Sequence, residues 1–597
     1  MSVLSIRDLT TAFATPSGWR NVVEGVSFDV DAGETVAIVG ESGSGKSVTA
    51  LSLMGLLPRN KTRVTGTINF RGRDLLALTD AEMQQVRGNE AAMIFQEPMT
   101  SLNPVMAVGR QIAEPIMRHR GLPRHDAMKE AIRLMDRVRI PAASKRAHEY
   151  PHEMSGGMLQ RVMIATALAC SPKLLIADEP TTALDVTIQA QILELIKELQ
   201  AEDHMAVMFI THDMGVVAEI ADRTVVMFRS KMMEAGATED IFSNPATDYT
   251  RELLAAAPRL GDLGDSPLPR PYPDRNGVTA EAADTVDRDG PALLNVENLT
   301  TRFELRKGVL GRVHARVHAV ENVSFALKKG ETLALVGESG CGKSTTGRSI
   351  LRLTEPAKGK VTLEGQDVGK LPRRDLMKLR QSMQMIFQDP FSSLNPRMRI
   401  GEAIAEPMLA HAIATPTEAR ARVASLLEQV GLSADMASRW PHEFSGGQRQ
   451  RIAIARALGL NPKVIIADES VSALDVTIKA QVVNLMMKLQ QELGLSYLFI
   501  SHDMAVVERI SHRVAVMLLG EIVEIGPRAE IFANPGHPYT RRLLSAVPEP
   551  DPARRNMRRN IPLQELKSPI FPSDFVPPHR TYDAVGPDHF VMRDAAA

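Results

Sequence analysis

Cysteine, aromatic side chains, net charge and long apolar runs are all scarce in this chain of 597 residues. Its two cysteines, Cys170 and Cys341, are too few for a disulfide scaffold and too far apart in the sequence for a metal-binding cysteine motif. The 70 basic and 71 acidic residues leave almost no net charge, which excludes a general nucleic-acid binder, so we expect no nucleic-acid partner. Aromatic residues make up only 4%, so we expect aliphatic cores in which some of the 30 methionines fill gaps.

The sequence also lacks any uninterrupted run of about 18 apolar residues, which excludes a membrane span within it. The first ten residues contain no apolar run, so we expect no signal peptide. The shares of hydrophobic (44%) and charged (24%) residues are typical of a soluble globular protein, and the length predicts several domains. We therefore expect a cytoplasmic chain for which any role at a membrane needs partner subunits.

The sequence does contain a long internal repeat. The segment VGESGSGKS at 39–47 returns as VGESGCGKS at 336–344, and IADEPTTALDVTI at 176–188 returns as IADESVSALDVTI at 466–478. Further segments recur in the same order, so the copies lie about 290 residues apart. A solenoid repeat spans only about 20 to 50 residues. The pattern therefore predicts a duplicated domain.

The domain boundaries follow from composition. Residues 261–292, between the copies, are rich in Pro, Gly and Asp, which is typical of a flexible linker with stiff proline patches. We therefore predict one domain at 1–260 and a second at 293–548, followed by a C-terminal extension with several prolines at 549–597.

Short apolar runs alternate with helical patterns in both copies. In the first copy, Thr35–Val39 is a β-branched run that ends at a glycine-rich turn, and the residues after Ser47 have the apolar spacing of a helix. Two further runs, at 174–177 and 205–210, end at an Asp-Glu pair and at a histidine. Strands that alternate with helices predict a largely parallel α/β sheet.

The glycine-rich turn of each copy fits the phosphate-binding pattern G-x-x-x-x-G-K-[ST]. Glycines let backbone N–H groups turn toward phosphate oxygens, while Lys46 reaches the β- and γ-phosphates and the Ser47 hydroxyl binds Mg²⁺. A second match at the equivalent place makes chance agreement negligible. The expected nucleotide-binding residues of the two loops are Gly40, Ser42, Gly43, Gly45, Lys46, Ser47 and Val48, and Gly337, Ser339, Gly340, Gly342, Lys343, Ser344 and Thr345.

An Asp-Glu pair follows an apolar strand in each copy, as Asp178-Glu179 and as Asp468-Glu469. Two carboxylates at the end of a buried strand are costly unless a cation or a reacting water needs them. The aspartate suits Mg²⁺ through water, and the glutamate suits polarising the attacking water. A salt-bridged structural pair is the alternative, which the recurrence beside a phosphate-binding loop disfavours.

A glutamine and a histidine also follow apolar strands in each copy. A lone glutamine at a strand end is usually a satisfied amide, but beside a phosphate-binding loop Gln96 and Gln388 can bind Mg²⁺ and sense the γ-phosphate. A lone histidine is more often structural than catalytic. Because His212 and His502 each end a strand of a nucleotide domain, we expect both to be catalytic.

The segments Ser155-Gly156-Gly157 and Ser445-Gly446-Gly447 each precede a helical pattern. A Ser-Gly-Gly helix start is an anion site, although alone it is a weak signal. Each copy already has its own phosphate-binding loop. We therefore predict that each Ser-Gly-Gly segment serves the nucleotide of the other copy.

The order of these motifs resembles that of the ATPase subunit of ABC transporters, over both copies. The resemblance implies an α/β fold of two tandem P-loop ATPase domains, each with a RecA-like parallel-sheet core, an antiparallel β subdomain and a helical signature subdomain. It implies ATP and Mg²⁺ as ligands, Glu179 and Glu469 as catalytic carboxylates, and His212 and His502 as γ-phosphate contacts. The Mg²⁺ residues implied are Ser47, Gln96 and Asp178, and Ser344, Gln388 and Asp468.

The same resemblance implies two nucleotides held between the copies, with Asp185 and Asp475 in loops that communicate across the interface. Phe13 and Phe303 are the implied adenine-stacking residues, with Trp19 and His318 as nearby competitors. The first composite site would join Lys46 and its partners to Ser445, Gly446, Gly447 and Gln448, and the second would join Lys343 and its partners to Ser155, Gly156, Gly157 and Met158.

The sequence departs from the family pattern at two places. Met158 stands where the signature usually has a glutamine, as in Gln448, and Ser470 stands where a proline such as Pro180 usually follows the Asp-Glu pair. Since both glutamates and both histidines are present, we predict that both sites hydrolyse ATP. Met158 should tune the rate rather than abolish it.

The segments NPATDYTRELL at 244–254 and NPGHPYTRRLL at 534–544 look like the C-terminal signature of the peptide and nickel importer branch. Fused tandem ATPases of this branch include importers of glutathione and of oligopeptides. The resemblance implies ATP-driven import of glutathione or short peptides at the cytoplasmic face of the inner membrane. It also implies two transmembrane permease subunits and, indirectly, a periplasmic or extracellular solute-binding protein.

Other readings stay open. The solute can be another peptide-like compound such as an opine, or nickel. A soluble tandem ABC ATPase without a transport role would share every nucleotide motif, but it tends to have a charged linker helix in place of a proline-rich segment. Some relatives carry a cysteine cluster in the tail for iron and sulfur, and since this tail has no cysteine we expect no cluster.

Overall fold

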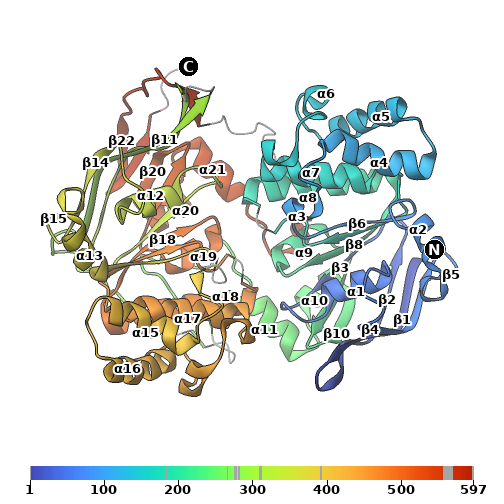
Figure 1. The fold of residues 1–597 in the computed structure, drawn as a ribbon, viewed down its shortest axis with the longest axis horizontal. Coiled ribbons are helices and arrows are strands. Elements are labelled where there is room, and N and C mark those ends of the chain that lie inside the picture. Colours follow the sequence, from blue (N-terminus) through green and yellow to red (C-terminus); the bar gives the residue numbers. More distant parts are fainter. Residues whose placement is uncertain are drawn as a thin grey trace.

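The structure is a computed structural model that describes residues 2–182, 184–264, 266–273, 278–279, 281, 283–307, 312–389, 393–472, 474–555 and 569–593. One residue in each of the loops that end at Asp185 and Asp475, and parts of the expected linker and C-terminal extension, lie outside these ranges. The two copies form two α/β halves that lie side by side (Figure 1). Their helical parts point to opposite ends, at the upper right in the first half and the lower left in the second, so the halves are arranged head to tail.

Each half is built on a parallel sheet whose strands are the short apolar runs of the sequence, which confirms the predicted fold class. In the first half the order is β9-β3-β8-β7-β6, and in the second it is β19-β13-β18-β17-β16. The central strands are buried along their whole length, because helices cover both faces of the sheet. The bounds are β3 (Thr35–Val39), β6 (Ala91–Ile94), β7 (Leu174–Asp178), β8 (Ala206–Thr211), β9 (Arg223–Phe228), β13 (Thr332–Val336), β16 (Met383–Ile386), β17 (Val464–Asp468), β18 (Ser496–Ser501) and β19 (Arg513–Leu518).

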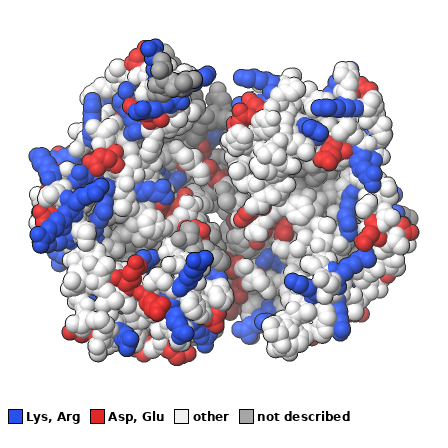
Figure 2. Space-filling model, viewed as in Figure 1, with Lys and Arg blue, Asp and Glu red and all other residues white. Residues whose placement is uncertain are grey.

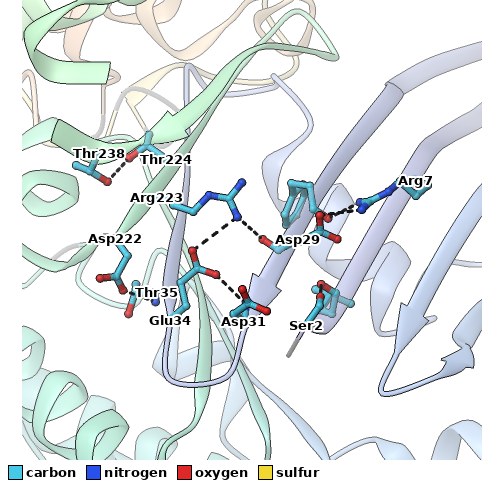
Figure 3. Close-up of polar contacts among 12 residues, drawn as sticks. Ser2, Arg7, Asp29, Asp31, Glu34, Thr35, Asp222, Arg223, Thr224 and Thr238 are labelled. Carbon is cyan, nitrogen blue, oxygen red and sulfur yellow. Dashed lines mark hydrogen bonds and ion pairs between the residues drawn. The ribbon is translucent and has the colours of Figure 1, made fainter. Parts of the chain in front are cut away.

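An antiparallel sheet adjoins this core in each half. In the first half it continues the parallel sheet, because Lys231 of β10 pairs with Glu24 of β2. Figure 3 shows the polar contacts near this junction, where the Arg223 guanidinium lies 3.7 Å from the Glu34 carboxylate and donates to the Asp29 carbonyl oxygen. The bounds are β1 (Ser2–Thr15), β2 (Gly18–Asp31), β4 (Thr62–Phe70), β10 (Lys231–Ala237), β11 (Leu294–Lys307), β12 (Arg312–Leu327), β14 (Lys358–Leu363) and β20 (Glu521–Pro527).

A helical subdomain completes each half, and the core of the first one is almost wholly aliphatic. In the first half, Phe209 is the sole aromatic side chain among the described buried residues of this cluster, which also holds Met135, Met158 and Met163. The helices are α4 (Val108–Arg120), α5 (Arg124–Arg137) and α7 (Gly156–Ala167), and α15 (Ile400–Ala410), α16 (Pro416–Gln429) and α17 (Gly446–Leu458). The long helices after β7 and β17 are α8 (Val186–Asp203) and α18 (Val476–Leu493).

The surface carries charges of both signs (Figure 2). Lys and Arg gather at the left edge of this view, over α13 (Arg373–Ser382) and β14 of the second half. No helix of the described residues is both long and apolar enough to span a membrane.

Part of the segment after the first half packs on the second half. Tyr272 is 3% exposed and lies in the core of the second half. Its backbone N–H donates to Asn484 Oδ1 at 2.8 Å, Asn484 Nδ2 donates to its carbonyl oxygen at 2.9 Å, and the Arg509 guanidinium covers its ring. One buried aromatic residue thus anchors this Pro-rich segment to the helix α18.

The C-terminal extension crosses in the opposite direction. A short helix at Pro552–Arg554 packs on α9 (Met214–Ile220) and α10 (Thr238–Ser243) of the first half, and Arg555 forms an ion pair with Asp222. The chain then returns to the second half as β21 (Ile570–Pro572), which pairs with β12, and as β22 (Tyr582–Gly586) and β23 (His589–Met592), which extend the sheet through β20.

The anchor predicts a stability difference between two variants of one residue. Tyr272→Ala should destabilise the second half by about 3 kcal/mol, because it empties a buried aromatic site. Tyr272→Phe should not destabilise it, because the buried Tyr272 hydroxyl has no hydrogen-bond partner among the described residues. Differential scanning calorimetry of both variants checks this, and equal melting temperatures for Tyr272→Ala and the parent chain would contradict the anchor.

Candidate active site

The two phosphate-binding loops have a backbone that only glycine fits. Gly40 has a φ of 151°, and a Cβ there would lie 2.0 Å from the Met227 carbonyl oxygen. Gly45 has a φ of 104°, and a Cβ there would lie 2.5 Å from the carbonyl oxygen of Val22. Gly43 also has a positive φ but faces open space, which leaves room for a phosphate. The second half repeats these features at Gly337, Gly340 and Gly342.

The loop lysines fold back over the loops. Lys46 Nζ donates to the carbonyl oxygens of Gly40 at 2.6 Å and Glu41 at 2.8 Å, and Lys343 Nζ does the same with Gly337 and Glu338. Burial lowers the pKa of Lys46 despite the carboxylates around it. A buried ammonium gains from an anion, so phosphate oxygens fit this place. The helices α1 (Lys46–Leu53) and α12 (Lys343–Ile350) start here, so Ser47, Val48, Ser344 and Thr345 lie in their first turns.

The chemistry of the aspartate and serine fits Mg²⁺ in each half. Ser47 Oγ donates to Asp178 Oδ1 at 2.9 Å, and Ser344 Oγ donates to Asp468 Oδ1 at 2.7 Å. Burial raises the pKa of Asp178 to about 6 and also raises the pKa of Asp468. Asp468 Oδ2 is buried without a hydrogen-bond partner among the described residues. A buried carboxylate with a free oxygen beside a hydroxyl is suited to a hydrated divalent cation.

The two glutamates that the sequence predicts to be catalytic have an unusual backbone and stay ionised. Glu179 and Glu469 have φ values of 47° and 46°, in the left-handed region, and their N–H groups donate at 2.9 Å to the neighbouring strands. Burial alone would raise the pKa of Glu179, but the hydrogen bond and charge of His212, with Thr182 and Lys46, outweigh it and lower the pKa to about 2. The histidine Nδ1 lies 3.3 Å from Glu179 Oε1. His502 lies 3.4 Å from Glu469 and likewise contributes to a lowered pKa of Glu469.

The structure brings the glutamine of each half onto the same glutamate. Gln96 Nε2 donates to Glu179 Oε2 at 2.8 Å, and Gln388 Nε2 donates to Glu469 Oε2 at 2.7 Å. The predicted site residues of each half therefore lie close together at the carboxyl ends of the parallel strands. They are the lysine, serine, aspartate, glutamate and histidine, together with the glutamine. Binding of Mg²⁺ by the glutamines stays a prediction.

Each phosphate-binding loop also contacts the other half. Asp475 Oδ1 accepts from the Ser42 N–H at 2.8 Å, and Thr477 Oγ1 donates to Glu41 Oε1 at 2.6 Å. The mirror contacts join Asp185 to the Ser339 N–H and Thr187 to the Glu338 carboxylate, each at 2.5 Å. Sequence reasoning identified Asp185 and Asp475 but missed both Thr–Glu pairs. The recurrence of Glu in both loops and of Asp-Val-Thr in both copies was the available signal.

The Ser-Gly-Gly segments begin helices α7 and α17 and pack within their own halves. The Ser445 hydroxyl accepts from the Gln448 N–H, and Gln448 Oε1 in turn accepts from the Ser445 N–H at 3.0 Å. Met158 has no such oxygen, and its side chain is buried in the core of the helical subdomain. Gly157 and Gly447 are close to Ile188 and Ile478 of their own halves, where a Cβ would lie 2.8 Å and 2.3 Å from a side-chain carbon. The pairing of each segment with the opposite nucleotide stays a prediction.

The proposed adenine-stacking residues occupy equivalent places. Phe13 pairs with Arg20 on the neighbouring strand, two residues before Val22, whose carbonyl oxygen lies beside Gly45. In the same way, Phe303 pairs with Val317, two residues before Ala319, whose carbonyl oxygen lies beside Gly342. Phe303 is 44% exposed, whereas its competitor His318 is buried against Phe571, Phe575 and Glu321. The other competitor, Trp19, lies under the Arg63 guanidinium.

Loss of the hydrogen bond between Gln448 and the Ser445 N–H should have a small effect on ATP turnover. Gln448→Met should lower ATP turnover about two- to fivefold without unfolding the chain, because it removes one cap hydrogen bond at Ser445. Steady-state phosphate release by the purified chain checks this, with the exposed Gln429→Met as the matched control. Equal turnover of Gln448→Met and the control would contradict a role for the cap.

Comparison with known proteins assigns the chain to a family. The sequence pattern of the family described as "ABC transporter" matches residues 23–182 and 320–472, and that of the "Oligopeptide/dipeptide transporter, C-terminal region" matches 233–276 and 523–569. The glutathione import ATP-binding protein GsiA of Pectobacterium atrosepticum is 55% identical over 606 residues, which cover 100% of this chain and 97% of that protein. GsiA of Escherichia coli K12 is 55% identical and GsiA of Salmonella typhimurium 54% identical, each over 99% of this chain and 97% of the relative.

Among solved structures, cbiO1 from Clostridium perfringens, part of the ABC transporter complex cbiONQ, is 29% identical, with a TM-score of 0.36 over 41% of this chain and 92% of that chain. The full-length similarity and the two matched ATPase regions agree with the geometry of the two sites. The chain belongs to the ABC transporter family, as a fused tandem ATPase of its peptide and nickel branch.

Proposed function

We propose that this ATPase is the energy-coupling subunit of an importer for glutathione, or for short peptides of that kind. Its support is the similarity, over their whole length, to proteins named as glutathione import ATP-binding proteins. Other peptide-like solutes such as opines or oligopeptides, and nickel, are the alternatives within the branch. A tandem ATPase without a transport role is disfavoured because the oligopeptide/dipeptide C-terminal region occurs in both halves.

Hydrolysis follows from the groups at each sheet edge. The loop N–H groups and Lys46 would hold the phosphates of ATP, and Ser47 and Asp178 would hold Mg²⁺, which would supply positive charge to the phosphate oxygens. Glu179 is ionised and therefore able to polarise the attacking water. His212 lies beside it, in position to donate to the γ-phosphate. In the second half, the same roles would fall to Lys343, Ser344, Asp468, Glu469 and His502.

One observation supports coupling between the two sites. Each phosphate-binding loop contacts the start of the long helix of the opposite half. Because ATP binds at that loop, its binding changes an interface rather than one half alone. Closure would bring Ser445, Gly446, Gly447 and Gln448 to the first nucleotide, and Ser155, Gly156 and Gly157 to the second. The nucleotide thereby biases a two-state closure.

The partners follow from this role. Two transmembrane permease subunits would dock on the chain near Gln96 and Gln388 and rock as the halves close. An external solute-binding protein would deliver the solute to them, so the chain would act at the cytoplasmic face of the membrane.

The proposal predicts loss of uptake when the glutamates are changed. Glu179→Gln with Glu469→Gln keeps the size of both side chains but removes the negative charge, so ATP turnover should fall at least about 100-fold. Uptake of labelled glutathione by cells that express this chain with its permease and binding protein should fall to background. Each single variant should retain part of the ATPase activity, because both sites hydrolyse ATP.

Glu492→Gln, at an exposed position near the end of α18, is the matched control and should leave uptake unchanged. Loss of ATPase activity in the double variant with unchanged glutathione uptake would contradict the role in import. Uptake of a labelled dipeptide but not of glutathione would move the proposal to its peptide alternative.

A further inference from the structure

A tyrosine from the C-terminal segment of each half reaches the phosphate-binding loop of that half. Tyr249 lies on α11 (Asp248–Ala256), and its hydroxyl oxygen accepts from the Glu41 N–H at 3.2 Å. Tyr539 lies on α21 (Pro538–Ser545), and its hydroxyl oxygen accepts from the Glu338 N–H at 3.0 Å. The exposed fractions of these tyrosines are only 8% and 5%. Tyr249 and Tyr539 both lie in the regions that match the oligopeptide/dipeptide transporter family.

Each tyrosine is held in place by other contacts of its segment. The Tyr249 ring stacks on Phe228 with centroids 4.1 Å apart. The chain on both sides of it is fixed by Glu234, which accepts from the Ala246 N–H at 2.8 Å and from the Thr250 hydroxyl at 2.7 Å. In the second half, Glu524 accepts from the N–H groups of Gly536 and His537. The hydroxyls are therefore fixed points against which a loop can be positioned.

The loop residue that each tyrosine binds is the one that reaches the opposite half. The Glu41 backbone N–H is bound by Tyr249, while its carboxylate is bound by Thr477 of the second half. The next N–H, that of Ser42, binds Asp475. Tyr539, Glu338 and Thr187 form the mirror chain of contacts. One loop residue per site thus connects a C-terminal segment with the interface between the halves.

The contacts also suit a neutral hydroxyl. Burial raises the pKa of both tyrosines above the ordinary value, so neither ionises near neutral pH. Without the hydroxyl oxygen, the Glu41 N–H would lose its acceptor at the point where the loop leaves β3 and turns around the phosphate site.

We propose that Tyr249 and Tyr539 are positioning residues for ATP hydrolysis. Each fixes the backbone N–H of the second residue of its phosphate-binding loop and keeps the carboxylate of that glutamate on the threonine of the opposite half. The affinity of each site for ATP thereby depends on the C-terminal segment of the same half. This role depends on the ATPase activity of the chain and not on the identity of the solute.

The test uses variants that keep the ring and remove only the hydroxyl. Tyr249→Phe, measured in a Glu469→Gln background so that the first site alone turns over, should raise the KM for ATP about three- to tenfold and change kcat less than about twofold. Tyr539→Phe in a Glu179→Gln background should do the same at the second site. We expect the KM to change more than kcat because the lysine, glutamate and histidine of each site are unchanged.

The matched control is Tyr497→Phe. It also removes a buried hydroxyl, which donates to the Met486 carbonyl oxygen at 3.1 Å, but Tyr497 lies near the start of β18, whereas the catalytic groups lie at the strand ends. It should lower the melting temperature as much as Tyr249→Phe and leave the KM unchanged. KM values for Tyr249→Phe and Tyr539→Phe that match this control would overturn the proposal.

A double-variant cycle tests the connection through the loop glutamate. Thr477→Val removes the hydrogen-bond donor to the Glu41 carboxylate, so its effect on the KM should be non-additive with that of Tyr249→Phe. Thr187→Val acts on Glu338 in the other site and should be additive with Tyr249→Phe. Additive effects in both cycles would overturn the claim that one loop residue connects the C-terminal segment with the opposite half.

Discussion

In each half, an aspartate at the start of a long helix accepts a hydrogen bond from the phosphate-binding loop of the other half. An aspartate at this position usually accepts a hydrogen bond from its own helix, which stabilises the helix by about 1 kcal/mol. Asp185 and Asp475 make no such cap on α8 and α18, and instead accept from the N–H groups of Ser339 and Ser42 across the interface. The position of each phosphate-binding loop is therefore set by both halves, and the two sites depend on this contact.

The position of the predicted catalytic groups depends on the parallel sheets. Adjacent parallel strands end at one edge, so the loop lysine, the Asp-Glu pair and the histidine meet there although they are far apart in the sequence. The left-handed backbone of Glu179 costs about 1 to 2 kcal/mol, and its N–H is held by the Ile210 carbonyl oxygen of the adjacent strand. The rigid strand pair thus holds a strained residue where its carboxylate meets His212 and Gln96.

Much of this site could be predicted from the sequence, because each group lies at the end of a short apolar run with a local pattern. The contacts between the halves could not, since Glu41 and Thr477 are 436 residues apart and neither belongs to a phosphate-binding consensus. Tyr249 was visible only as part of a family-like segment, and its place on the loop is set by the packing of α11. The burial of Tyr272 could not be predicted from composition, because one aromatic residue has little weight in a segment of prolines and glycines.

The most direct test of the central claim is to map, half by half, where a photoreactive ATP analogue labels the Asp475→Ala variant. The variant changes only the second half, yet we expect weaker labelling of the first phosphate-binding loop, because the Ser42 N–H loses its acceptor. Labelling of the second loop should stay at the level of the parent chain, and Asp185→Ala should give the mirror result. Weaker labelling of the second loop alone in Asp475→Ala would contradict the account.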